Sequence, residues 1–209
     1  REFLNEKLEI FDRRNRLKKT FSNSIALISS QIPDNPTKEI IEANSLLIPH
    51  IIEVATSTSA YLSDDNLIWP FTALSRFYEG QGFYHIAEIW AEQCVDEHQA
   101  RFSSNNINTA ISMYNLAGIY WNHKVYEPAE SFYLSALESY KDLLGDNHSL
   151  TIRCLNNLAT VFHMQERYDE AEPLYREISE FRESLLGENH PETIASIINL
   201  ASLCAEQAK

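Results

Sequence analysis

The sequence has few residues that break helices, and it lacks the motifs of several large protein classes. Its 209 residues include only 5 glycines and 7 prolines, a composition that favours helices over a turn-rich β fold. No apolar run approaches the roughly 18–20 residues of a membrane helix, and no secretory signal opens the chain. The phosphate-binding motif GxxxxGK(S/T) does not occur. We therefore expect a helical protein without a membrane span or a nucleotide site in these residues.

Cysteine is scarce and scattered. Cys94, Cys154 and Cys204 form no CxxC pair, and all three fall on expected helix faces, at positions otherwise filled by small or apolar residues. This pattern predicts buried, reduced thiols and a cytoplasmic protein. No cluster of ligating residues predicts a metal, and we expect no cofactor. No catalytic arrangement of Ser/His/Asp, Cys/His or paired carboxylates stands out, so we do not expect an enzyme.

Positive charge is scarce in most of the chain. The formal net charge is −13, with +1 in residues 1–50 and −14 in residues 51–209. An acidic surface repels phosphate backbones, so we expect no nucleic-acid partner. A basic or neutral polypeptide partner is favoured, and the alternative is that the acidic residues serve only solubility.

What the sequence does contain is an internal repeat with a step of 42 residues. LGDNH at 144–148 returns as LGENH at 186–190. Columns of identical residues keep the same step: Tyr84, Tyr126, Tyr168; Ala87, Ala129, Ala171; Thr109, Thr151, Thr193; and Asn115, Asn157, Asn199. The pattern predicts first helices near 67–79, 108–121, 150–164 and 192–206, and second helices near 84–100, 126–143 and 168–185.

The connecting loops carry their own signals. Gly145 and Gly187 stand where a helix ends with a left-handed residue, and we expect Asn189 to cap the next helix, with Pro191 in its first turn. His148 and His190 invite a metal or catalytic interpretation, but a loop or capping contact is favoured because no other ligand accompanies them.

The repeated pattern resembles the tetratricopeptide repeat family. The third unit contains Leu155-x2-Leu158-Ala159-x2-Phe162-x8-Ala171-x3-Tyr175-x2-Ile178, and the second contains Met113-x2-Leu116-Ala117-x2-Tyr120-x8-Ala129-x3-Tyr133-x2-Ala136. The long period, with NNLA, YDEAEPLY and LGENHPET, is similar to kinesin-light-chain repeats. The resemblance implies an all-α fold, an α-α superhelix over residues 63–209 with units at about 67–108, 109–150, 151–192 and a partial unit 193–209.

Residues 1–107 show a second resemblance, carried by REFLNEKLE, IPHIIEVA and LIWPFTALSRFYEGQGFY. These segments look like the region after the winged helix in bacterial NB-ARC-type (STAND) signal-transduction ATPases, where a repeat array acts as the sensor. Apolar residues at helical spacing also predict an N-terminal helical segment at 1–62, broken at residues 31–36 and kinked or divided at Pro49. The chain starts at Arg1 and stops at Lys209 within a repeat, so we expect a part of a longer protein.

In tetratricopeptide folds the first helix of each pair lines a concave groove, and the resemblance implies a peptide or protein ligand there. The positions that map onto this face are Arg76, Tyr114, Asn115, Trp121, Arg153, Asn156, Asn157, His163 and Asn199. An amide both donates and accepts hydrogen bonds, so the Asn column suits an extended peptide; the alternative is that it fixes the stacking of repeats. We expect a protein-binding sensor module, with a constitutive scaffold that self-associates through the array ends as the alternative.

Overall fold

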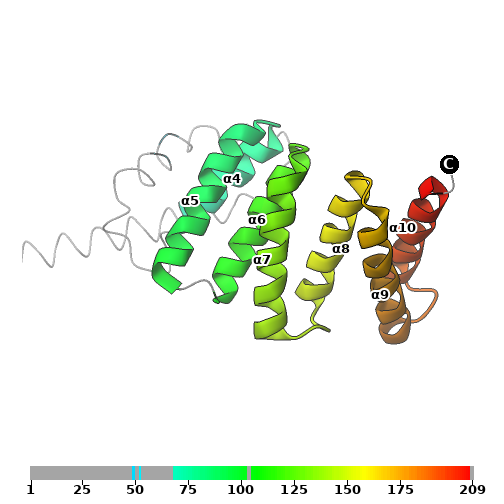
Figure 1. Ribbon diagram of the computed structural model, residues 1–209. Helices are drawn as coiled ribbons and strands as arrows, with labels where there is room; N and C mark the ends of the chain where they lie inside the picture. Colours follow the sequence, from blue (N-terminus) through cyan, green and yellow to red (C-terminus); the bar gives the residue numbers. More distant parts are fainter. Residues whose placement is uncertain (1–48, 50–51, 53–67, 103–104, 208–209) are drawn as a thin grey trace, which may run out of the picture. The chain divides into compact units, whose positions relative to one another are not determined.

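The computed structural model describes residues 49, 52, 68–102 and 105–207. This part of the chain contains seven helices and no strand, and Figure 1 shows them in chain order. Their bounds are α4 Ile68–Gly80, α5 Tyr84–Phe102, α6 Ile107–Asn122, α7 Tyr126–Leu144, α8 Ser149–Met164, α9 Tyr168–Leu186 and α10 Pro191–Gln207. The expected N-terminal helices, their division near Pro49 and the domain boundary at residues 62 and 63 lie outside the described residues.

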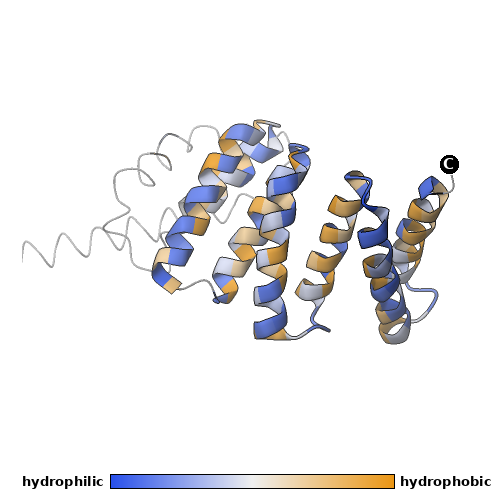
Figure 2. Cartoon of the chain, in the orientation of Figure 1, coloured by the Kyte–Doolittle hydropathy of each residue, from blue (hydrophilic) through white to orange (hydrophobic). Residues whose placement is uncertain are grey.

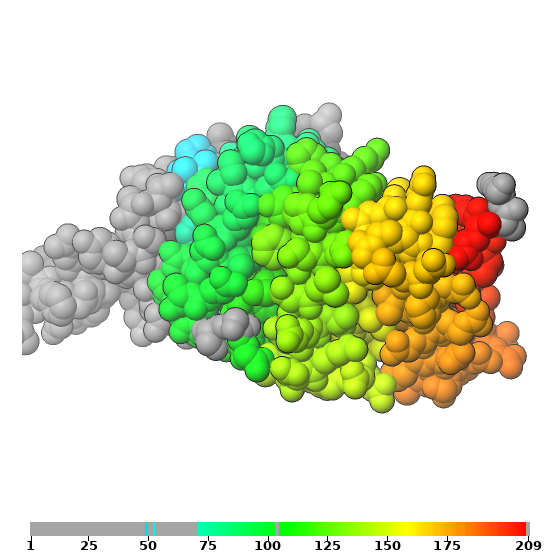
Figure 3. Space-filling view, in the orientation of Figure 1, coloured from blue at the N-terminus to red at the C-terminus, as the bar shows by residue number. Residues whose placement is uncertain are grey.

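The chain divides into two compact units, Arg1–Arg101 and Phe102–Lys209. In the first unit α4 and α5 meet through the rings of Phe71 and Trp90, whose centroids are 6.1 Å apart, and through Thr72 and Cys94. The second unit holds α6 to α10, and each of these helices packs against the next along the chain. In the space-filling view α7, α8 and α9 adjoin one another (Figure 3).

The 42-residue step predicted the helix positions. The second helices begin at Tyr84, Tyr126 and Tyr168, and the first helices α6, α8 and α10 begin at Ile107, Ser149 and Pro191. From residue 68 onward, the bounds predicted for each helix lie within two residues of the observed ones. Each helix carries both apolar and polar residues along its length (Figure 2), as expected for helices that bury one face.

Small residues let the two helices of a pair approach closely, as the sequence predicts. Ala117 and Ala159 on first helices are fully buried, and so are Ala129 and Ala171 on the second helices opposite them. Large buried side chains fill the space around these contacts: Leu116, Tyr133, Leu158, Tyr175 and Ile178. Close packing of this kind makes each buried position sensitive to its volume.

The turn inside each pair is closed by a left-handed residue. Gly82, Lys124 and Glu166 occupy equivalent positions and have φ values of 79°, 63° and 60°. At the α8–α9 turn the Arg167 N–H donates to the Phe162 carbonyl and the Glu166 N–H donates to the His163 carbonyl. This pair of bonds is the Schellman arrangement, which satisfies carbonyls left over at a helix end.

The loops between pairs confirm one prediction and correct another. Gly145 and Gly187 have φ of 88° and 86°, the positive values predicted for them. His148 and His190 are capping residues: each Nδ1 accepts a backbone N–H two residues ahead, at 3.2 Å. The prediction that Asn189 caps α10 is wrong, because the backbone N–H of Glu192 in the first turn donates to the imidazole of His190 instead.

The last helix departs from the buried pattern. Cys94 and Cys154 are buried free thiols as predicted, but Cys204 is exposed. Ala201 is also exposed, although its equivalents Ala117 and Ala159 are fully buried. The reason is local: α7 covers α6 and α9 covers α8, whereas the corresponding face of α10 carries exposed isoleucines at 194, 197 and 198.

Candidate functional site

The predicted groove residues fall in both units. Arg76 lies on α4 in the first unit, and the other eight lie on α6, α8 and α10 in the second. The candidate site is therefore built within the second unit, where the structure relates these residues to one another.

Asn157 is turned toward the neighbouring helices. Its side-chain nitrogen donates to the hydroxyl of Tyr114 on α6 at 2.9 Å and to the hydroxyl of Tyr133 on α7 at 3.2 Å. An amide NH₂ has two hydrogens, so both are used in holding α6, α7 and α8 together. The structure therefore gives Asn157 a stacking role, the alternative that the sequence left open for this column.

Tyr114 contacts both Asn157 and the cationic side chain of Arg153. The guanidinium carbon of Arg153 lies 5.0 Å from the centroid of the Tyr114 ring, and the Tyr114 ring meets that of Tyr133 edge-on at 5.5 Å. Burial raises the pKa of the Tyr114 phenol, so the hydroxyl stays neutral. Arg153 itself is exposed, so its charged group lies at the surface beside the Tyr114 ring.

Three other predicted residues differ in their access to solvent. Asn115 is exposed, whereas Asn156 is half-buried. Trp121 is half-buried against Tyr126, with ring centroids 5.5 Å apart. Trp121 thus packs against the start of α7 and is also partly exposed. Asn115 is the exposed member of the Asn column.

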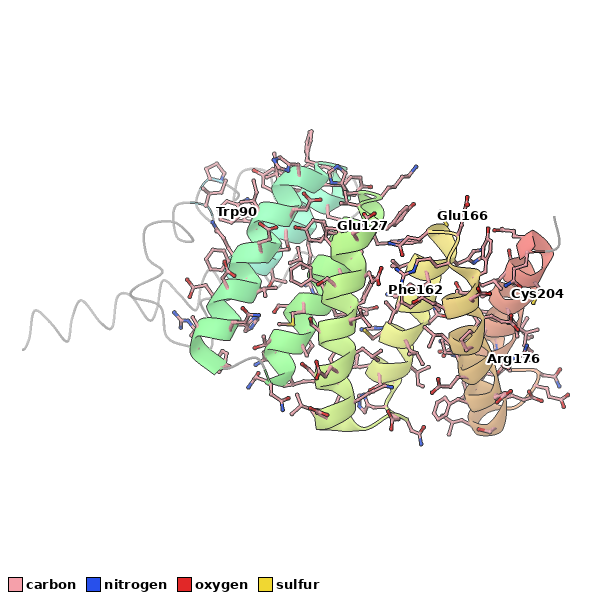
Figure 4. All side chains as sticks on the ribbon, in the orientation of Figure 1. Trp90, Glu127, Phe162, Glu166, Arg176 and Cys204 are labelled. Atoms are coloured by element: carbon pink, nitrogen blue, oxygen red, sulfur yellow. The ribbon has the colours of Figure 1, made fainter. Side chains whose placement is uncertain are left out.

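The remaining two, His163 and Asn199, come together in a pocket between α8 and α10. This pocket, which we call the α8–α10 pocket, has a volume of about 430 Å³. Its lining consists of Thr160, His163, Met164, Glu166, Tyr168, Tyr175, Asn199, Ser202 and Glu206. Glu166 projects at the α8–α9 turn in Figure 4. The volume falls in the range of about 300–1,000 Å³ common for ligand sites.

Hydrogen bonds and ring contacts fix the walls of the α8–α10 pocket. His163 Nε2 and Glu206 Oε2 are 2.9 Å apart and join α8 to α10 across 43 residues of sequence. The imidazole also packs edge-on against the rings of Tyr168 and Tyr175. The Tyr175 hydroxyl donates to Thr160 Oγ1 at 3.1 Å. The pocket is thus a preformed, polar site with aromatic sides.

The sequence did not single out Tyr168, Tyr175 or Glu206 for binding. The two tyrosines belong to repeat columns that look structural, and Tyr175 is indeed buried. A signal for Glu206 was present in the repeat: the equivalent residue 42 positions earlier is Met164, so a carboxylate replaces an apolar side chain. The column as a whole is variable, with Asn122, Met164 and Glu206, so it gives each pair of repeats a different side chain at this position.

Arg167 does not neutralise the carboxylates of Glu166 and Glu206, because its guanidinium is bound to other glutamates. Arg167 follows Glu166, but its guanidinium is bound by Glu170 at 2.7 Å and by Glu130 at 2.5 Å. It also lies 4.4 Å from the centroid of the Phe162 ring. The hydrogen bonds from Arg167 lower the pKa of the Glu170 carboxyl, which keeps the pair charged.

A second pocket, of about 510 Å³, lies toward the other end of α8. Arg153 lines it together with Leu185, His190 and Arg182. Arg182 also contacts α10, because its Nη1 donates to the carbonyl of Glu192 at 3.3 Å.

Among the described residues no group of three or more His, Cys, Asp or Glu side chains is placed to hold a metal ion. In the same part of the chain no helix is long and apolar enough to cross a membrane.

Paired antiparallel helices that repeat at a fixed step define a helical repeat protein, a class whose stacked units present extended surfaces. A family model, the tetratricopeptide repeat, matches residues 67–142, 124–184 and 163–209. The chain belongs to the tetratricopeptide repeat family. Among curated proteins, none matches the sequence.

Solved structures agree with this fold. A protein of Podosopora anserina described as a kinesin light chain with nearly identical TPR-like repeats is similar at a TM-score of 0.68, with 18% identity over 93% of this chain and 87% of that one. BtubC (BKLC) from P. vanneervenii gives 0.62, with 17% identity over 88% and 83%. The apo form of RapI gives 0.54, with 14% identity over 93% and 70%. At these identities the likeness concerns the fold.

Proposed function

We propose that the second unit is a protein-interaction module that binds an extended peptide segment along α6, α8 and α10. The observation that carries the proposal is the α8–α10 pocket, because three of its lining residues, Asn199, Ser202 and Glu206, come from one first helix and Thr160 and His163 from another. Exposed Arg153 beside Tyr114 extends the polar and aromatic surface along the same helices. Such convergent polar groups on a rigid scaffold suit recognition rather than chemistry.

Affinity capture with matched variants tests this proposal. The full chain is immobilised and exposed to an extract of its native host, in parallel with an Asn199→Ala/Ser202→Ala variant and a control variant, Ser131→Ala/Ser135→Ala, on the exposed side of α7. A partner held by the first-helix face is retained by the parent and the control and lost by the Asn199/Ser202 variant. A partner retained equally by all three would place binding elsewhere.

We further propose that the module is the sensor region of a cytoplasmic signal-transduction ATPase. The support is the resemblance of residues 1–107 to the region after the winged helix in NB-ARC-type proteins. The coding sequence upstream of Arg1 tests it. A GxxxxGK(S/T) motif within a few hundred codons is expected, and an open reading frame without one would reject the sensor role while leaving peptide binding intact.

A constitutive scaffold is the second candidate, and the open face of α10 favours it. Ile194, Ile197 and Ile198 are 45%, 45% and 60% exposed, and exposed apolar patches often mark contact surfaces. Light scattering across a concentration series decides between the two. A ligand-independent oligomer that dissociates on Ile197→Lys/Ile198→Lys supports the scaffold, and a monomer at all concentrations rejects it.

A further inference from the structure

The α8–α10 pocket combines aromatic rings with carboxylates, the two groups that attract an organic cation. Tyr168, Tyr175 and His163 supply the rings, and Glu166 and Glu206 supply the charge. The pKa of the Tyr168 phenol is raised, first by partial burial and then by the charges of Glu166 and Glu206. The pKa of the Tyr175 phenol is raised mainly by burial, and the negative charge of Glu206 raises it further. Both phenols therefore lie near the Glu206 carboxylate, and Tyr168 lies near Glu166 as well.

The carboxylates remain accessible to a ligand. Glu206 accepts one contact from His163, and its side chain is still 43% exposed, while Glu166 is also exposed at the rim. A neighbouring pocket, lined by Asp169, Glu170 and Gln207 as well, shares Glu166, Tyr168 and Glu206 with the first. Residues 102–209 contain 7 Lys and Arg against 15 Asp and Glu, so the net charge of the second unit is also negative and favours a cationic ligand.

The preceding pair of first helices shows that this chemistry is not a general property of the repeat. At the positions of Glu166 and Glu206 it has Lys124 and Met164. The equivalent of Asn199 is Asn157, whose NH₂ group is occupied by Tyr114 and Tyr133. At equivalent backbone positions, the α6–α8 pair therefore has a lysine and an amide whose hydrogens are both bonded. The α8–α10 pair has two carboxylates and a pocket.

We propose that the α8–α10 pocket binds the side chain of a lysine or arginine in the partner peptide. Its charged end contacts Glu206 and Glu166, and its aliphatic stem lies along Met164 and the ring of Tyr168. A cation over an aromatic face beside a carboxylate is favoured because both groups attract it and the site is partly shielded from water. This inference deepens the proposed function and rests on it.

Backbone NMR of the full chain tests the proposal with defined probes. The probes are the pentapeptides acetyl-Ala-Ala-Arg-Ala-Ala-amide and its Lys, Gln and Glu counterparts, titrated into ¹⁵N-labelled protein. The Arg and Lys peptides are expected to shift the amides of residues 160–168 and 199–206 saturably. The Gln and Glu peptides are expected to leave those amides unchanged, and added salt is expected to weaken the cationic peptides.

A charge-matched pair of variants separates the site from the general acidity of the chain. Glu166→Gln/Glu206→Gln removes two charges in the pocket, and glutamine keeps the shape and the hydrogen bond to His163. Glu183→Gln/Glu188→Gln removes one charge near the C-terminal end of α9 and one in the loop after it. Along the helix axis Glu183 is about 22 Å from Tyr168. The pocket variant is expected to weaken the Arg peptide at least about fivefold, and the control less than about twofold.

Equal weakening by both variants, or equal shifts from the Arg and Gln peptides, would overturn the proposal. A saturable response to the Glu peptide at Tyr114 and Arg153, with none at 199–206, would overturn the cation pocket and leave the peptide-binding function standing. No saturable response to any of the four peptides would also reject the cation pocket, and the affinity capture described above then decides the function independently.

Discussion

The side-chain nitrogen of Asn157 lies 2.9 Å from the phenolic oxygen of Tyr114, 43 residues earlier in the chain. This bond and a second one from the same nitrogen to the hydroxyl of Tyr133 tie three consecutive helices together. Asn157 belongs to the column that the sequence offered either for peptide contact or for repeat stacking, and its NH₂ group holds the repeats together.

Asn157→Ala is expected to lower the free energy of unfolding by about 1–3 kcal/mol, because it removes the amide that donates to the hydroxyls of Tyr114 and Tyr133. Asn115→Ala removes an exposed amide in the same repeat column and is expected to cost less than about 0.5 kcal/mol. Urea denaturation followed by circular dichroism measures both. Equal values for the two variants would show that the Asn157 bonds contribute nothing to stability.

Leu158→Ala is expected to destabilise the second unit by about 2–5 kcal/mol, because Leu158 is 2% exposed at the centre of the α8–α9 pair. Ile198→Ala is the matched control, since it removes a comparable volume from a side chain that is 60% exposed. Thermal unfolding is the measurement. A midpoint for Leu158→Ala as high as that of the control would contradict the packing described above.

Substitutions at the equivalent turn residues Lys124 and Gly82 are expected to change the free energy of unfolding in opposite directions. Lys124 adopts φ of 63°, which costs a residue with a Cβ energy that glycine does not pay, so Lys124→Gly is expected to stabilise by roughly 0.5–1 kcal/mol. Gly82 has φ of 79° and open space around it, so Gly82→Ala is expected to cost about 1 kcal/mol through the backbone alone. Chemical denaturation of both variants is the check, and a stabilising Gly82→Ala would disprove the argument.

The thiols are expected to react in two classes. At neutral pH a maleimide should label Cys204, which is exposed, and should reach Cys94 and Cys154 only after unfolding. Burial raises the pKa of Cys94 to about 11 and of Cys154 to about 12. Mass spectrometry of the labelled chain reads out the result, and labelling of Cys154 at the rate of Cys204 would contradict the burial.

These raised pKa values also predict a loss of stability at high pH. The folded state keeps both thiols protonated, whereas the unfolded chain releases the protons near pH 9. Stability from this source is therefore complete below pH 9 and falls between about pH 9 and 12. Cys154→Ala is expected to reduce the slope of the unfolding midpoint against pH in that window, and an unchanged slope would assign the loss to other groups.

The last helix is expected to open before the rest of the second unit. α10 packs on α9, while its isoleucines at 194, 197 and 198 remain exposed, so fewer apolar contacts oppose its opening than oppose that of α8. Hydrogen exchange should be faster in Pro191–Gln207 than in Ser149–Met164. Slower exchange in α10 would indicate that its open face is covered in solution, as the scaffold alternative requires.

The sequence by itself determined the helices and the core. A period of 42 residues relates the starts of α6, α8 and α10 and those of α5, α7 and α9. The columns of Ala and Leu identify the buried positions of α6 to α9, because the same residues at the same spacing pack in the same way in each repeat. The turn glycines follow from the same columns. For these features, the interactions that decide the structure are close in sequence or repeated along it.

Only the tertiary structure decided which side chains remain open to a partner. Whether an Asn of the repeated column is bonded or free depends on tyrosines supplied by two other helices, as at Asn157. Whether a position in the repeat is buried depends on the helix that covers it, so Cys204 is exposed although its column looked apolar. The pairing of His163 with Glu206 joins residues 43 apart, and spacing along one helix carries no information about such a contact.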